Sequence, residues 1–219
     1  MEIDALKFDR IARTVFAPIY PLIADQIIAR TGVTRGVCLD IGCGGGYLGT
    51  AIAKVTDLFV HFFDKSADML TIAARTIAEN GLQARAATLQ GEASAIALPD
   101  ESVDLAISRG SVYFWEDMPR AFAEIYRVLA PDGWAYIGGG FGSKRLKEDI
   151  ERKMTSDAQR GEQFRNRVRR NLGQDTRSQF ETALKSAGID TFSILHSEEM
   201  GLWLVMRKST PLLHDRTGR

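Results

Sequence analysis

Short apolar runs alternate with amphipathic stretches along most of the chain, a pattern typical of an α/β protein. The runs are mostly continuous in apolar character, as expected for parallel strands that are buried on both faces of a sheet. They predict strands at residues 37–41, 58–63, 87–90, 103–108 and 135–138. The intervening stretches predict helices at residues 47–54, 67–80 with Gly81 as the stop signal, and 117–129 with Pro131 and Gly133 as terminators.

Right-handed crossovers between these strands would place helices on both faces, so the chain predicts a doubly wound, mostly parallel α/β sheet. A helix at 176–187 precedes two further strand-like runs, 191–197 and 202–208, which a short polar link separates. This arrangement predicts an antiparallel C-terminal hairpin at the edge of the sheet. At the other end, helical segments at 8–16 and 22–29 are interrupted by prolines and predict an N-terminal cap.

The length of 219 residues favours one compact domain with additions. We predict a helical cap over residues 1–34, the main domain over 35–208 and a frayed polar tail over 209–219. A helical insertion at 143–171 carries ten basic residues against five acidic ones. A solvated pair of helices is the simpler interpretation of this insertion, and a lid that attracts an anionic substrate is the alternative.

The overall charge gives no reason to expect a nucleic-acid or membrane partner, although a local basic patch stays compatible with it. The 28 basic and 28 acidic residues cancel, so nothing in the net charge favours binding to nucleic acid or to an anionic membrane. Cys38 and Cys43 are too few for a disulfide framework, and no Cys or His spacing predicts a metal site. We also find no signal peptide and no apolar run long enough to span a membrane, and we therefore expect a cytoplasmic protein.

A glycine-rich loop, residues 42–46, joins the first predicted strand to the first helix. Without a Cβ, glycine lets the backbone approach a ligand and adopt positive φ at little cost. The helix that follows directs its free N–H groups and the positive end of its dipole into the same space. Such a loop at the carboxyl end of a central strand is the usual cofactor site of a doubly wound fold.

The glycines can be aligned with two spacing patterns, and each pattern favours a different cofactor. Gly44, Gly46 and Gly49 satisfy G-x-G-x-x-G, and Asp64 follows at a distance suited to ribose hydroxyls, which favours a dinucleotide and an NAD(P)-dependent oxidoreductase. In the other frame, Asp40 lies two residues before Gly42. A carboxylate there would repel a pyrophosphate but bind a cationic amino group, which favours S-adenosylmethionine.

Four segments in order resemble the motifs of class I S-adenosylmethionine-dependent methyltransferases. They are LDIGCGGG at 39–46, FFDKSADML at 62–70, QGEASAIALPDESVDLAIS at 90–108 and EIYRVLAPDGWAYIGG at 124–139. The resemblance covers about residues 35–140 and implies a seven-stranded sheet of order 3-2-1-4-5-7-6, closed by the antiparallel hairpin. It implies S-adenosyl-L-methionine as the cofactor, and a Rossmann-like domain that binds it.

The same resemblance implies a set of cofactor contacts. The methionine end would be bound by Asp40, Gly42, Cys43 and Gly44, with a backbone contact from Arg109. The ribose and adenine would be bound by Asp64, Lys65 and Met69, and the adenine edge by Glu92 and Ala93. Glu92 departs from the family pattern, in which an aspartate is commoner at that position.

Methyl transfer requires chiefly that the nucleophile and the methyl group are aligned in a water-poor pocket, so a dedicated base is optional. Tyr20, Tyr113 and Glu116 are weak candidates for a proton acceptor, while Asp117 is better interpreted as a helix N-cap. The segment after the fourth strand lacks the D/N-P-P-Y/F signature of enzymes that methylate exocyclic or amide nitrogens. A small-molecule acceptor is the class that remains, and a noncatalytic S-adenosylmethionine-binding module is a further alternative.

Overall fold

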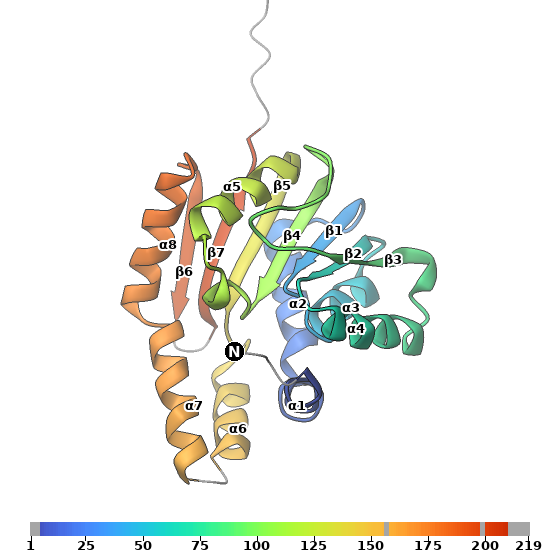
Figure 1. The fold of residues 1–219 in the computed structure, drawn as a ribbon. Helices are drawn as coiled ribbons and strands as arrows, with labels where there is room; N and C mark the ends of the chain where they lie inside the picture. Colours follow the sequence, from blue (N-terminus) through green and yellow to red (C-terminus); the bar gives the residue numbers. More distant parts are fainter. Residues whose placement is uncertain (1–4, 156–157, 198–199, 210–219) are drawn as a thin grey trace, which may run out of the picture.

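A computed structural model describes residues 5–155, 158–197 and 200–209 of the chain. Its strands form one seven-stranded sheet of order β3-β2-β1-β4-β5-β7-β6 (Figure 1). Neighbours from β3 to β5 pair in parallel, and β7 pairs antiparallel with both β5 and β6. The predicted doubly wound sheet and its antiparallel hairpin are therefore confirmed. The strands are β1 (Val37–Ile41), β2 (Phe59–Asp64), β3 (Ala86–Gln90), β4 (Val103–Arg109), β5 (Leu129–Gly139), β6 (Phe192–Ser197) and β7 (Gly201–Arg207).

Helices cover both faces of this sheet and also extend beyond one end of it (Figure 1). The α-helices are α1 (Ala5–Ile11), α2 (Ile19–Thr31), α3 (Tyr47–Val55), α4 (Ala67–Glu79), α5 (Met118–Val128), α6 (Lys144–Met154), α7 (Ala158–Asn171) and α8 (Gln174–Ser186). A π-helical turn, η1 (Ala12–Phe16), continues α1, and short 3₁₀ turns lie at η2 (Gln83–Arg85) and η3 (Val112–Phe114).

Alternate residues of each central strand enter opposite halves of the core. In β1, Cys38 packs with α2, α3 and α4, whereas Leu39 packs with α5 and α8. Phe62 and Phe63 of β2 divide in the same way. This alternation follows from the twofold period of a strand, and because both faces are covered, both sets are apolar. The sheet, packed on both faces, therefore positions the loops at its carboxyl edge.

Two predicted boundaries are wrong. Pro131 and Gly133 do not follow helix α5 as terminators but lie inside β5, which begins at Leu129 opposite Val103. An irregularity in the pairing absorbs the extra residues, and Asp132 takes a left-handed φ of 64° there. At the N-terminus, Pro21 does not interrupt a helix, because it lies in the first turn of α2, where a missing N–H has no cost.

The segments outside the sheet lie as follows. The described residues of the predicted insertion at 143–171 form α6 and α7, which extend with α1 beyond the carboxyl ends of β1 and β4 (Figure 1). Helix α2, from the predicted cap at 1–34, buries Ile19, Ile23 and Ile27 in the core. Residues 1–4 of that cap and residues 210–219 of the predicted tail are outside the described residues. The cap therefore contributes to the core as well as covering the end of the sheet.

Among the described residues, no single helix has the length and apolar character needed to cross a membrane. Taken together, Ala5–Phe16 and Ile19–Thr31 meet both criteria, but the two segments are bent by 75°.

Candidate functional site

The glycine loop after β1 is held in a left-handed conformation. Gly42, Gly44 and Gly46 have φ values of 65°, 53° and 80°. The N–H groups of Gly42 and Cys43 donate to the carbonyl of Phe63 at 2.7 and 3.0 Å, which fastens the loop to the neighbouring strand. A side chain is disfavoured at these φ values, so the frame 42, 44 and 46 carries the conformational requirement.

Gly49, the third glycine of the alternative frame, has a different role. It lies in α3, and a Cβ there would be 2.6 Å from the ring of Phe62 and 2.9 Å from Oδ2 of Asp40. Its N–H donates to that same Oδ2 at 2.9 Å. Gly49 is therefore explained by the close packing of α3 on β1 and β2, and it supplies no evidence for a pyrophosphate.

Asp40 is a buried carboxylate with 2% of its surface exposed. Burial raises the pKa of Asp40 to about 7, and the hydrogen bond from Gly49 N–H opposes that rise. No ion pair joins Asp40 to a basic side chain of the described residues. A carboxylate in this position gains most from a ligand that brings its own positive charge.

Asp64 ends β2 and organises two backbone segments. Its Oδ2 accepts from the N–H of Gly44 and its Oδ1 from the N–H of Ser66, both at 2.9 Å. Ser66 in turn caps α4 by accepting from the N–H of Met69 at 3.3 Å. Because each Asp64 oxygen accepts a hydrogen bond from a different segment, the carboxylate fixes the glycine loop and the start of α4 relative to each other.

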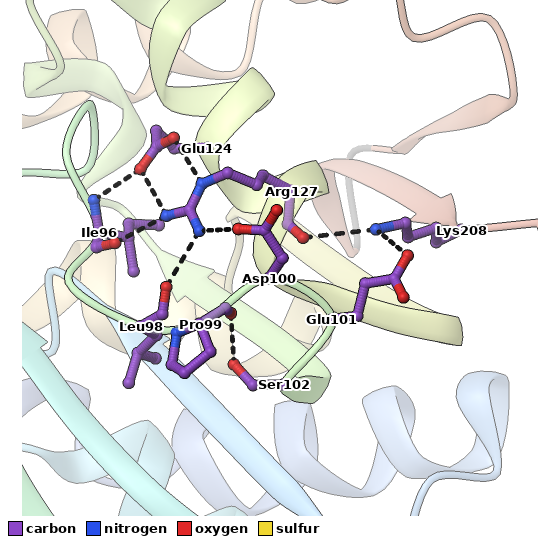
Figure 2. Close-up of polar contacts among 9 residues, drawn as sticks. All are labelled: Ile96, Leu98, Pro99, Asp100, Glu101, Ser102, Glu124, Arg127 and Lys208. Carbon is purple, nitrogen blue, oxygen red and sulfur yellow. Dashed lines mark hydrogen bonds and ion pairs between the residues drawn. The ribbon is translucent and has the colours of Figure 1, made fainter.

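The loop between β3 and β4, residues 91–102, is fastened to α5 by Arg127. Figure 2 shows its guanidinium in contact with both oxygens of Glu124, at 2.8 Å each, and with the carbonyls of Ile96 and Leu98 at 2.8 and 3.0 Å. The N–H of Ile96 also donates to Glu124 at 2.9 Å, and the Arg127 contact lowers the pKa of Glu124. This network holds the loop that carries two of the predicted adenine contacts.

A cavity of about 370 Å³ opens at the carboxyl ends of β1, β2 and β4. All ten predicted cofactor contacts line it, as do the three candidate proton acceptors, although their roles stay predictions. Lys65 and Glu92 form an ion pair of 3.9 Å on its rim. The thirteen are Tyr20, Asp40, Gly42, Cys43, Gly44, Asp64, Lys65, Met69, Glu92, Ala93, Arg109, Tyr113 and Glu116.

The part of the cavity over β4 and β5 is aromatic and basic. The aromatic residues that the sequence offers for an acceptor pocket all line the cavity, namely Phe16, Tyr20, Tyr113, Phe114 and Trp115, whereas its basic side chain was not predicted. Arg109 was predicted to contribute only backbone, yet its side chain lies in the cavity under the ring of Phe16, 4.7 Å from the ring centre. Phe141 and Phe164 complete this wall, with ring centres 6.3 and 6.4 Å from the centre of the Phe16 ring. Their convergence depends on how η1 and α7 fold over the strand ends, which no local pattern encodes.

Neither candidate tyrosine has a lowered pKa. Burial raises the pKa of Tyr20, and the charge of Arg109 opposes that effect. Burial also raises the pKa of Tyr113 strongly, and its hydroxyl has no hydrogen-bond partner among the described residues. Glu116 is exposed at the rim. Asp117 accepts from the N–H of Arg120 at 3.0 Å, which confirms it as the N-cap of α5.

Residues 39–137 match a family model described as a methyltransferase domain. A candidate S-adenosyl-L-methionine-dependent methyltransferase from Methanococcus maripaludis, solved by crystallography, is similar over nearly the whole molecule. It is 40% identical, the alignment covers 95% of this chain and 94% of that one, and the TM-score is 0.89.

Two curated relatives match over shorter stretches. The uncharacterized methyltransferase YdaC of Bacillus subtilis is 33% identical over 112 residues, which are 50% of this chain and 60% of YdaC. The mitochondrial arginine-hydroxylase NDUFAF5 of Mus musculus is 32% identical over 147 residues, which are 66% of this chain and 39% of that protein. The chain thus spans less than two thirds of either relative, and the two names differ in reaction.

Proposed function

The chain belongs to the S-adenosylmethionine-dependent methyltransferases of the Rossmann-like class I fold, and on that premise we propose that it methylates a small molecule by in-line displacement. One observation carries the proposal: a single cavity is lined on one side by the cofactor motifs and on the other by an aromatic wall. Helices α6 and α7 contribute Met154 and Phe164 to that wall, so a compact acceptor fits better than a polymer.

The residues present fit S-adenosylmethionine. Asp40 is a buried carboxylate without a basic partner among the described residues, and this cofactor brings an ammonium group and a sulfonium. Gly44 faces open space, since the nearest atom to a Cβ built there is in Phe8 at 3.9 Å. A dinucleotide fits less well, because its pyrophosphate would lie beside the same carboxylate.

We assign the cofactor contacts along the strand ends. Asp40 and the backbone of residues 42–44 would hold the amino-acid end, and Asp64 would accept hydrogen bonds from the ribose. Lys65 and Met69 would flank the adenosine, with Glu92 and Ala93 at the adenine edge. When bound, S-adenosylmethionine supplies an electrophilic methyl carbon, whose bond to sulfur breaks as the lone pair of the acceptor forms the new bond.

The protein contributes alignment and exclusion of water rather than proton abstraction. Tyr20 and Tyr113 both have raised pKa values, so neither is a phenolate near neutral pH and neither serves as a base. The acceptor therefore reacts as an anion or releases its proton to solvent, and the exposed Glu116 is not required as a base. The aromatic side chains of the wall would hold the acceptor in line with the methyl group.

Calorimetry with S-adenosylhomocysteine tests the cofactor assignment, and we expect a dissociation constant in the micromolar range. Failure of the wild-type protein to bind it would reject the proposal. Quenching of protein fluorescence by NADH at similar concentrations would instead support the oxidoreductase alternative. Transfer of a labelled methyl group from S-adenosylmethionine to a metabolite extract distinguishes the enzyme from a noncatalytic binding module, which would bind the cofactor without turnover.

A further inference from the structure

We propose that Arg109 binds a carboxylate group of the methyl acceptor, so that the acceptor is an anionic molecule with an apolar or aromatic body. This inference deepens the proposed function and depends on it. It rests on the chemistry of the cavity wall over β4 and β5, where a guanidinium lies among aromatic rings.

The charge of Arg109 has no counterion in the described part of the chain. Its Nη2 donates to the carbonyl of Gly140 at 3.2 Å, and the guanidinium also forms a side-chain hydrogen bond with the neutral hydroxyl of Tyr20. Nε is buried and has no hydrogen-bond partner, and no described carboxylate forms an ion pair with the guanidinium. A shielded cation with free donors costs free energy unless an anion neutralises it.

The surroundings hold the cation in place but leave its Nε without an acceptor among the described residues. The Phe16 ring lies 4.7 Å from the guanidinium carbon and the Tyr20 ring 5.9 Å from it. Such contacts attract the charge through the faces of the rings, but they accept no conventional hydrogen bond. The hydroxyl of Tyr113 is also buried, and no described residue forms a hydrogen bond with it. Arg109 and Tyr113 together therefore offer donors suited to a carboxylate.

Position separates this group from the adenosine half of the cavity. Arg109 ends β4 and contacts Gly140, just beyond β5, whereas Asp64 ends β2 and Glu92 follows β3. In the strand order of the sheet, β1 lies between these two groups. Asp64 and Glu92 thus lie where the cofactor is assigned, and the guanidinium lies on the side left for the acceptor, with Glu116 and Asp117 exposed at the rim.

A carboxylate there would also be favoured by the rest of the wall. Arg167 of α7 lines the same cavity and adds a second positive charge. The rings of Phe16, Phe141 and Phe164 form an apolar surface for the body of the acceptor. An anionic acceptor bound here would be attracted both by the Arg109 guanidinium and by the sulfonium of the cofactor, and this attraction is stronger where the dielectric constant is low.

Matched pairs of small ligands test the proposal on the protein loaded with S-adenosylhomocysteine. The pairs are 3-phenylpropionate with 3-phenylpropanamide, and hexanoate with hexanamide, titrated by saturation-transfer NMR. In the wild type we expect the carboxylate of at least one pair to bind about tenfold tighter than its amide. Arg109→Gln should reduce that preference to about twofold or less while the dissociation constant of S-adenosylhomocysteine changes by less than about threefold.

Arg177→Gln is the matched control, because Arg177 pairs with Glu181 on the surface of α8, outside the cavity, and its loss should leave the preference intact. Arg109→Lys, which retains the charge, replaces Arg109→Gln if the latter does not fold, and should lower the preference at least threefold through loss of the planar fork. Absence of a carboxylate preference in the wild type, or its survival in the Arg109 variant, overturns the proposal.

The carboxylate of the cofactor is the competing occupant. If it binds Arg109, Arg109→Gln would weaken S-adenosylhomocysteine more than tenfold while leaving 5′-methylthioadenosine, which lacks the amino-acid end, unaffected. That result would also overturn the assignment to the acceptor. Failure of the wild type to bind S-adenosylhomocysteine at all would instead count against the proposed function, so the two failures are distinguishable.

Discussion

The carboxylate of Asp64 accepts a hydrogen bond from the backbone N–H of Gly44 at 2.9 Å and so joins the end of β2 to the glycine loop after β1. The second oxygen of Asp64 accepts from Ser66 at the same distance, at the start of α4. One side chain thus shapes three backbone segments around the cavity, in addition to the ribose contact we assign to it. Substitution there should affect both stability and cofactor binding.

We expect Asp64→Ala to lower the affinity for S-adenosylhomocysteine by about 100-fold, because two charge-assisted hydrogen bonds within the site and the ribose contact are lost together. The free energy of unfolding should fall by about 1–3 kcal/mol, since the N–H groups of Gly44 and Ser66 lose their acceptor. Calorimetry and urea denaturation measure the two effects. Asp68→Ala, an exposed acid in the first turn of α4, is the control and should leave affinity within about twofold.

The raised pKa of Asp40 predicts a pH dependence of stability. The folded pKa is about 7, against an ordinary value of 3.8, so the folded state keeps a proton that the unfolded state has lost. Stability linked to this group is therefore greatest below pH 3.8 and falls as pH rises to about 7. Asp40→Asn removes that dependence, and its Oδ1 can still accept from the N–H of Gly49.

The difference in unfolding free energy between Asp40→Asn and the wild type should grow in favour of the variant by about 2–4 kcal/mol as the pH rises from about 4 to about 8. Urea denaturation across that range measures the difference, and a constant offset between the two proteins would contradict the assigned cause. The same variant should bind S-adenosylhomocysteine more weakly at about pH 8, because the ammonium loses its ionised partner. Greater stability with weaker binding is the combination expected of a carboxylate kept for a ligand.

Arg127 provides a prediction about the loop between β3 and β4. Arg127→Gln should lower the free energy of unfolding by about 2–3 kcal/mol, because the carbonyls of Ile96 and Leu98 and the carboxylate of Glu124 lose their donor. Hydrogen exchange should increase across residues 91–102. Arg120→Gln is the matched control, since Arg120 donates through its side chain to a single carbonyl, that of Ser94. Equal effects of the two variants would contradict the conclusion that Arg127 holds the loop at residues 91–102 to α5.

Much of this fold could be predicted because its information is local. Continuous apolar runs indicate strands buried on both faces, and Gly81 ends α4 with a φ of 66° as its position in the pattern indicates. Pro131 was misread for a tertiary reason, since β5 begins before it by pairing with β4. Pairing with β4 therefore makes a strand of the residues around Pro131, which the local pattern alone indicated as a loop after the helix.

The convergence of the predicted cofactor contacts on one cavity could be predicted for a similar reason, because glycines and acids at strand ends have fixed consequences for backbone geometry. On the other side of the cavity, aromatic residues could be named from the sequence, but the role of the Arg109 side chain and the contribution of α7 could not. Arg109 is the last residue of β4 and carries no motif of its own, and its surroundings come from Phe16 and Phe164, which are far apart in the chain. Only the packing of η1 and α7 over the sheet brings them together, and this packing depends on side-chain shape rather than on periodicity.

Tyr113 distinguishes a wall residue from a catalytic base. Its buried hydroxyl has no partner among the described residues, so Tyr113→Phe should raise the free energy of unfolding by about 1 kcal/mol in the absence of ligand. Because burial raises the pKa of Tyr113, the variant should lose only about tenfold in methyl transfer to the active extract fraction, the effect of one hydrogen bond to the acceptor rather than of a base. Tyr126→Phe, whose ring lies 5.5 Å from the Lys208 ammonium outside the cavity, is the control and should change neither property. A loss of transfer of about 100-fold or more in Tyr113→Phe would identify the tyrosine as a proton acceptor and contradict the mechanism without a base.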